Sequence, residues 1–171
     1  MNSRTRLPRS GTRGYAHLTE IAVPVSRVWS ALPAAAVVRA WSGQDAELAA
    51  RKGGSYRIGR RQAGGREAHI DIFDVDRRLR LIYLCGPDEP PSGSAVVDDF
   101  LLDIRMGDGT TSLRVLGSGI PEAAAWDKHY VRMRVMWERF LSNIKVVLEA
   151  PPPPKKPPAA PKDPPLAGLD Y

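Results

Sequence analysis

The chain has little of what builds covalent or metal-based sites. Its single cysteine, Cys85, cannot form an internal disulfide and supplies no metal cluster, which fits a reducing cytoplasm. No stretch approaches the roughly 18 consecutive apolar residues that cross a bilayer. The basic start is followed by no apolar run of signal-peptide length. We therefore expect a cytoplasmic protein without membrane insertion.

Short catalytic motifs are missing as well. The sequence contains no Gly-x-Ser-x-Gly elbow, no Gly-x-x-x-x-Gly-Lys phosphate loop and no His-Glu-x-x-His pair. The glycine pairs Gly53-Gly54 and Gly64-Gly65 are more typical of hairpin turns than of a phosphate cradle, because such turns need positive φ. We expect no cofactor and no metal, and these absences favour a non-enzymatic protein without deciding the point.

Positive charge is concentrated at the ends of the chain. The net charge is +6, but Arg4, Arg6, Arg9, Arg13 and the C-terminal lysines supply most of it, which leaves residues 14–149 with +1. A nearly neutral body does not resemble a surface that follows a nucleic-acid backbone. No stable nucleic-acid complex is expected.

Composition divides the chain into three parts. Nine of the 16 prolines lie between Pro151 and Pro165, where too few apolar residues are present to offset the entropy of ordering. We expect a basic disordered arm over residues 1–13, one domain over 14–149 and a Pro-rich disordered tail over 150–171. The tail is interpreted as a solvated spacer, with docking to an aromatic groove of a partner left open.

The periodicity of the central part predicts an order of elements. A strand is expected near residues 14–23, two short helices near 26–32 and 34–41, and about six strands from Asp45 onward. A helix of some 28 residues is then expected to start at Pro121. Its apolar stripe runs through Trp126, Tyr130, Met133, Trp137, Leu141, Ile144 and Leu148. This order predicts an α+β helix-grip fold, in which a curved antiparallel sheet of about seven strands wraps around the C-terminal helix.

Several segments resemble a known family. They are residues 21–32 (IAVPVSRVWSAL) with Trp41, residues 51–56 (RKGGSY), residues 72–79 (IFDVDRRL), and residues 109–121 followed by Trp126 and Trp137. Together they resemble the START-like superfamily (SRPBCC, Bet v 1-like), in the branch of the Hsp90 ATPase activator's C-terminal domain. The resemblance covers roughly residues 15–149. It departs from the usual pattern at Ile70, where many members have glycine, and at the missing proline after Asp76.

The resemblance implies an internal cavity, because this superfamily includes lipid carriers, plant hormone and allergen proteins, and polyketide cyclases. Fold alone does not settle the function. The candidate cavity residues are Trp41, Tyr56, His69, Tyr83, Asp98, Phe100, Trp126, Tyr130, Met133 and Trp137. His129 lies one residue off the helix stripe and is expected to face solvent.

Three functions remain open at this point. The leading hypothesis is non-enzymatic binding of a small apolar or aromatic ligand, in a carrier, sensor or stress-response role. The second is a cyclase or aromatase that uses His69 with Asp71 or Asp98 as an acid–base pair, which requires those side chains to face inward. The third is a co-chaperone-like or tail-mediated interaction, and an exposed sheet edge also leaves a homodimer open.

Overall fold

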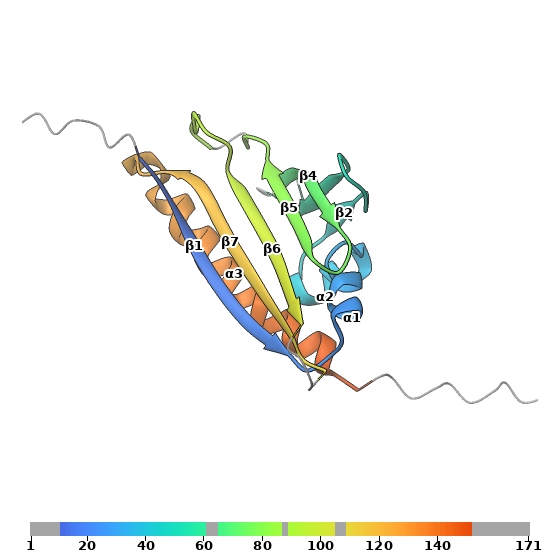
Figure 1. Cartoon of the computed structure of the whole chain (residues 1–171). Coiled ribbons are helices and arrows are strands. Elements are labelled where there is room, and N and C mark those ends of the chain that lie inside the picture. Colours follow the sequence, from blue (N-terminus) through green and yellow to red (C-terminus); the bar gives the residue numbers. More distant parts are fainter. Residues whose placement is uncertain (1–10, 61–64, 87–88, 105–108, 152–171) are drawn as a thin grey trace, which may run out of the picture.

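One antiparallel sheet with its helices on one face forms the domain (Figure 1). The computed structural model describes residues 11–60, 65–86, 89–104 and 109–151. The strands are β1 (Thr12–Ile21), β2 (Ala46–Leu48), β3 (Ser55–Ile58), β4 (Arg66–Asp74), β5 (Arg78–Tyr83), β6 (Val97–Ile104) and β7 (Thr111–Pro121). The helices are α1 (Val25–Ala31), α2 (Ala35–Ser42) and α3 (Asp127–Glu149), with a 3₁₀ turn, η2 (Ala124–Trp126), before α3. This arrangement confirms the α+β helix-grip prediction.

The strand order is β1-β7-β6-β5-β4-β3-β2. Strands β2 to β6 each pair with the next strand along the chain, as expected for short antiparallel connections. β1 is the exception, because it pairs with the last strand, β7, from Thr12 opposite Pro121 to Ile21 opposite Thr111. The two short helices after β1 carry the chain to the far edge, where β2 begins.

Proline and glycine set the ends of the short helices. Pro24 is the extended residue that precedes α1, and Pro33 lies between the two helices, where it cannot donate the amide that a continuous helix needs. Gly43 ends α2 in the left-handed conformation, with φ of 66°, which glycine adopts without steric cost. The predicted pair of short helices is therefore present within one residue of its expected bounds.

The long helix starts later than the sequence predicted. Pro121 ends β7 instead of opening the helix, and α3 has 23 residues, or about 35 Å at 1.5 Å per residue. The chain stays extended there because the Glu122 amide donates to the Gly11 carbonyl at 3.0 Å, which prolongs the β1–β7 ladder. The predicted 28-residue helix is thus wrong at its start, where η2 intervenes.

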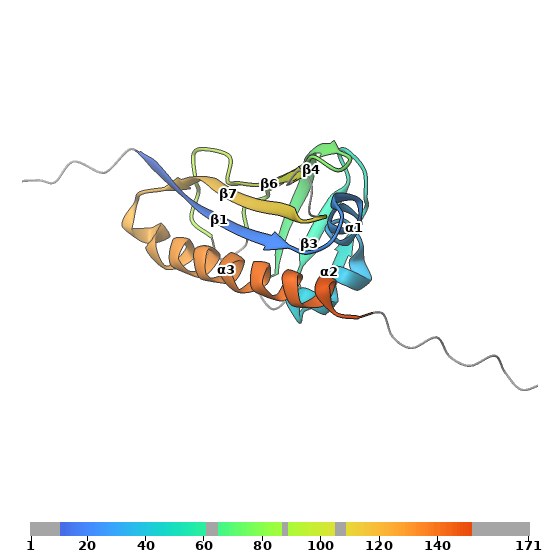
Figure 2. The ribbon, with the colours of Figure 1, turned by 60° about the horizontal axis from the view of Figure 1, so that its bottom comes forward.

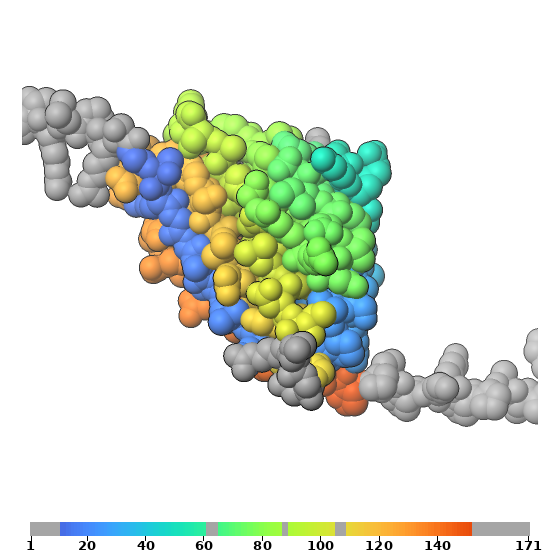
Figure 3. Space-filling view, viewed as in Figure 1, coloured from blue at the N-terminus to red at the C-terminus, as the bar shows by residue number. Residues whose placement is uncertain are grey.

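The side chains of each strand alternate between the helix-facing inner side and the outer side of the sheet. Figure 2 shows α3 beneath the strands β1 and β7, and Figure 3 shows the outer face, where neighbouring strands form a continuous surface. The inner side carries the buried core of the domain, including Ile21, Leu81 and Phe100. No helix of the described residues is long and apolar enough to span a membrane.

The predicted tails fall largely outside the described part of the chain. Residues 1–10 of the expected arm and 152–171 of the expected tail are not described, and β1 begins at Thr12, two residues before the expected strand. Cys85 is exposed and lies just beyond the end of β5.

Candidate functional site

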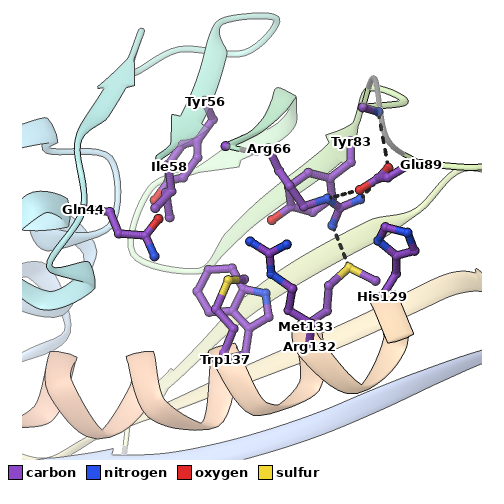
Figure 4. Close-up of a pocket in the computed structure, with 13 residues that line it drawn as sticks. Gln44, Tyr56, Ile58, Arg66, Tyr83, Glu89, His129, Arg132, Met133 and Trp137 are labelled. Atoms are coloured by element: carbon purple, nitrogen blue, oxygen red, sulfur yellow. Dashed lines mark hydrogen bonds and ion pairs between the residues drawn. The ribbon is translucent and has the colours of Figure 1, made fainter. Parts of the chain in front are cut away.

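A pocket of about 200 Å³ lies between the N-terminal half of α3 and the inner faces of β3, β4 and β5 (Figure 4). It arises because the helix packs mainly on β1 and α2, while the curved sheet turns away from it toward β3. The pocket therefore lies between the long helix and the sheet.

Aromatic and thioether side chains form its inner walls. They are Tyr56, Tyr83, Met133, Met136 and Trp137, with Ile58 from β3. The Tyr56 hydroxyl donates to the Leu32 carbonyl at 2.9 Å, so its ring, and not its hydroxyl, faces the pocket. Burial raises the pKa of Tyr56 above its usual range. These walls suit an apolar or aromatic occupant.

One wall is closed by an ion pair between β4 and the segment after β5. Arg66 Nε lies 2.8 Å from Glu89 Oε1, and both side chains are mostly buried, at 18% and 10% exposure. The same guanidinium lies 4.0 Å from the centre of the Tyr83 ring and 2.7 Å from the Met133 sulfur. Arg66 is therefore held by partners on three sides.

Two further polar side chains reach the pocket from α3. His129 and Arg132 line it one turn apart, Met133 adjoins Arg132, and Met136 lies one turn further along, as expected for residues three or four apart on a helix. Gln44, which follows α2, lines the opposite end. The pocket thus has an apolar interior and a polar rim.

Asp98 lies behind the pocket wall as a buried carboxyl. It is 1% exposed, accepts a hydrogen bond from Trp137 Nε1 at 2.7 Å and another from the Tyr15 hydroxyl. The Tyr83 hydroxyl is a further hydrogen-bond partner. Burial raises the pKa of Asp98 above its ordinary value of 3.8, although these hydrogen bonds and the charge of Arg66 oppose the rise.

The next residue, Asp99, points to the other side of the sheet. It pairs with Arg78 at 2.6 Å and with Arg80 at 2.9 Å. Burial alone would raise the pKa of Asp99, but the two guanidinium groups lower it below its ordinary value. Consecutive aspartates on one strand therefore have opposite pKa shifts because they face different environments.

Four of the ten predicted cavity residues line the pocket: Tyr56, Tyr83, Met133 and Trp137. Asp98 contacts two of them from behind. Trp41 and Phe100 lie deeper, in an aromatic cluster around Trp137 with ring centres 6.2 and 5.0 Å from it. They support the pocket floor and do not line it.

Trp126 and Tyr130 do not line the pocket. Tyr130 turns toward β1, where its hydroxyl donates to the Gly14 carbonyl at 3.0 Å and its ring lies 4.5 Å from the Arg13 guanidinium. Trp126 is buried in η2, beside His129 and a much smaller cavity of about 10 Å³. The helix stripe predicted both residues at the pocket, but the turn before α3 places them on other sides.

His69 lies on the outer face of the sheet. Its neighbours Ala68 and Ile70 are buried on the inner face, and a β-bulge between Ile70 and Ile72 leaves Asp71 without a cross-strand partner. Asp71 lies 3.9 Å from Arg80 on the outer face. The inward-facing acid–base pair of His69 with Asp71 or Asp98 is therefore not formed.

Sequence reasoning missed Arg66, Glu89, His129, Arg132 and Met136 as pocket residues. His129 was expected to face solvent, and it instead lines the pocket. On α3, His129, Arg132 and Met136 each lie one position before a residue of the apolar stripe that packs on the core. The spacing of His129, Arg132 and Met136 was a visible signal, but it acquires meaning only when the sheet is known to turn away from the helix.

Residues 22–149 match the family described as "Activator of Hsp90 ATPase homolog 1-like protein". No curated protein matches the chain.

Similar solved structures share the fold at low sequence identity. The Aha1 dimer from Colwellia psychrerythraea is 19% identical with a TM-score of 0.67, and the alignment covers 80% of this chain and 96% of that one. An HSP90 activator from Plasmodium falciparum is 19% identical with a TM-score of 0.66, over 81% and 97%. CalU16 from Micromonospora echinospora is 19% identical with a TM-score of 0.63, over 81% and 77%.

At these identities the structural neighbours establish the fold alone. The family match spans most of the chain and includes the helix pair, six of the seven strands and α3. The chain therefore belongs to the family of Activator of Hsp90 ATPase homolog 1-like proteins, with the helix-grip fold of the START-like superfamily.

Proposed function

We propose that this protein binds a small apolar or aromatic molecule in the pocket between α3 and strands β3 to β5, without chemically converting it. The observation that carries the proposal is the pocket of about 200 Å³ itself, with an interior of aromatic and methionine side chains. A pocket with apolar walls stabilises a matching ligand because binding removes apolar surface from water.

The acid–base geometry supports binding over a cyclase reaction. A cyclase that used His69 needs this imidazole beside its substrate, whereas His69 and Asp71 lie across the sheet from the pocket. Asp98 is separated from the pocket by Tyr83 and Trp137, which line it. We therefore assign Asp98 a role in positioning those two walls.

Native mass spectrometry of the purified full chain, followed by denaturing extraction, tests the proposal directly. A defined bound mass, together with thermal stabilisation by that compound, would support it. An empty protein that no apolar or aromatic compound stabilises would sink it.

A pair of α3 variants locates the binding. Met136→Trp places a larger side chain in the pocket and should weaken ligand binding about tenfold or more, because it takes the space that the ligand would desolvate. Val135→Trp is the matched control, since Val135 is 50% exposed and does not line the pocket. Equal binding by both variants would place the ligand elsewhere.

A second candidate is stimulation of an Hsp90-type chaperone, which the family match favours. An ATPase assay of an Hsp90 with and without the full chain tests it. The Pro-rich tail offers a separate partner site, and loss of partner binding after deletion of residues 150–171 would distinguish tail binding from pocket binding.

A further inference from the structure

The positive side chains around the pocket are not equally paired. Arg66 forms an ion pair with Glu89 and contacts Tyr83 and Met133, so its charge is already balanced. Arg132 is exposed on α3 and has no hydrogen bond or ion pair with any residue that the structure describes. Figure 4 shows its guanidinium extending from the helix into the space between the helix and the sheet.

This arrangement leaves an excess positive charge beside apolar walls. The charges of Arg66 and Glu89 cancel, and the positive charge of Arg132 is left unbalanced. A guanidinium presents donors in a planar fork that fits both oxygens of a carboxylate. Its position next to Met133, Met136 and Trp137 would let one molecule place a ring among the apolar side chains and a carboxylate at Arg132.

The volume limits the size of that molecule. A cavity of about 150 Å³ accepts benzene, and pockets for drug-sized ligands have about 300 to 1,000 Å³. At about 200 Å³, the pocket has room for one ring with a short substituent and is too small to enclose a sterol or a fused four-ring substrate completely.

We propose that the ligand is a single-ring aromatic carboxylic acid, bound as its anion, with the ring against Trp137 and the carboxylate paired with Arg132. This assignment rests on the proposed ligand-binding function and narrows it to one chemical class. It differs from binding of a neutral apolar molecule in requiring Arg132.

The experiment compares phenylacetate with phenylacetamide, which has nearly the same shape and no charge, by isothermal titration of the full chain. Phenylacetate should bind about 10-fold or more tightly than the amide, as expected for one charge-assisted hydrogen-bonded pair. Arg132→Gln should remove this preference and leave the weaker binding of the amide unchanged.

Arg139→Gln is the matched control. Arg139 lies on the same helix, is exposed and does not line the pocket, and its replacement changes the net charge by the same amount. It should leave the preference intact. Both positions are exposed, so the variants are expected to fold, and circular dichroism of each checks this point.

Three outcomes overturn the assignment. Equal binding of acid and amide would remove the anion preference while leaving pocket binding in place. A preference that survives Arg132→Gln, or that Arg139→Gln weakens equally, would place the charge recognition elsewhere. If neither compound binds, the aromatic-acid assignment fails, and the native mass spectrum then decides separately whether the broader binding function fails with it.

Discussion

Gly117 and Tyr15 are opposite each other on β7 and β1, and their fit fixes the Tyr15 hydroxyl on Asp98. The Tyr15 ring covers Gly117 so closely that a Cβ atom at this position would lie 2.2 Å from the ring. Real side chains do not approach this closely, so glycine here is required by packing. Gly117 belongs to a segment that resembled the family, but nothing in the sequence indicated that Tyr15 is the residue it packs against.

Gly117→Ala should lower the free energy of unfolding by about 1–3 kcal/mol, because the added methyl group displaces a ring in a filled core. Urea denaturation measures the change. In a Tyr15→Ala background the same substitution should cost much less, since the ring that it meets is gone. An equal cost in both backgrounds would show that the ring is not what excludes a side chain at Gly117.

Asp98 shows how far a local pattern can identify a functional position. Asp98 alternates with the apolar Val96, Phe100 and Leu102, which made it a candidate cavity residue, but the same alternation is typical of an aspartate that faces solvent. In the structure Asp98 is buried and does not line the pocket. Its partner Tyr15 is 83 residues away, and the two meet only because β1 joins the sheet beside β7. Local spacing contains no information about such a pairing.

At the scale of single elements, β5 and β6 form an ion-pair cluster on the outer face of the sheet. Asp99 accepts hydrogen bonds from Arg78 and Arg80, which are two residues apart and on the same face of the neighbouring strand. The cluster holds two like charges close together, and Asp99 is the group that offsets their repulsion.

Asp99→Ala should therefore lower the free energy of unfolding by about 1–3 kcal/mol, since two charged donors lose their acceptor. Asp103→Ala is the control on the same strand, because Asp103 is exposed, and its effect should stay within about 0.5 kcal/mol. Urea is the appropriate denaturant, because guanidinium salts screen the ion pairs. Similar effects of the two variants would remove the special role of Asp99.

Helix α3 shows why the site was harder to predict than the fold. Its core stripe was apparent because Met133, Trp137, Leu141 and Ile144 recur at helical spacing, and all four are buried. The start of the helix was misplaced because the hydrogen bond that the Glu122 amide donates to the Gly11 carbonyl across the sheet overrode the local preference of Pro121. Arg132 and His129 were missed because a polar residue beside a cavity has the same sequence pattern as one in solvent.

At the scale of the whole molecule, Asp98 connects elements that are otherwise far apart in sequence. Its partners come from β1, β5 and α3, and the pocket lies against two of them. Ionisation of the Asp98 carboxyl therefore affects the packing of α3 against the sheet. The raised pKa of Asp98 means that the folded protein holds its proton more tightly than the unfolded chain does.

The directions of the two pKa shifts determine how the stability of the protein changes with pH. Above the ordinary value of 3.8, the unfolded chain loses the Asp98 proton first, so stability from this group falls as pH rises toward the raised pKa. Asp99 acts oppositely and in a lower range, because its lowered pKa makes stability fall as pH drops below 3.8. The two aspartates titrate in separate pH windows on either side of that value.

Asp98→Asn isolates the first effect, because asparagine can accept from Trp137 and does not titrate. The difference in unfolding free energy, wild type minus variant, should be flat below pH 3.8 and then decline by up to about 1.4 kcal/mol per pH unit until the raised pKa is passed. Urea denaturation of both proteins between pH 3.5 and 8 measures it. A difference that does not change with pH would mean that Asp98 has the same pKa in both states, and the balance between its burial and its three hydrogen-bond partners would then have to be close to even.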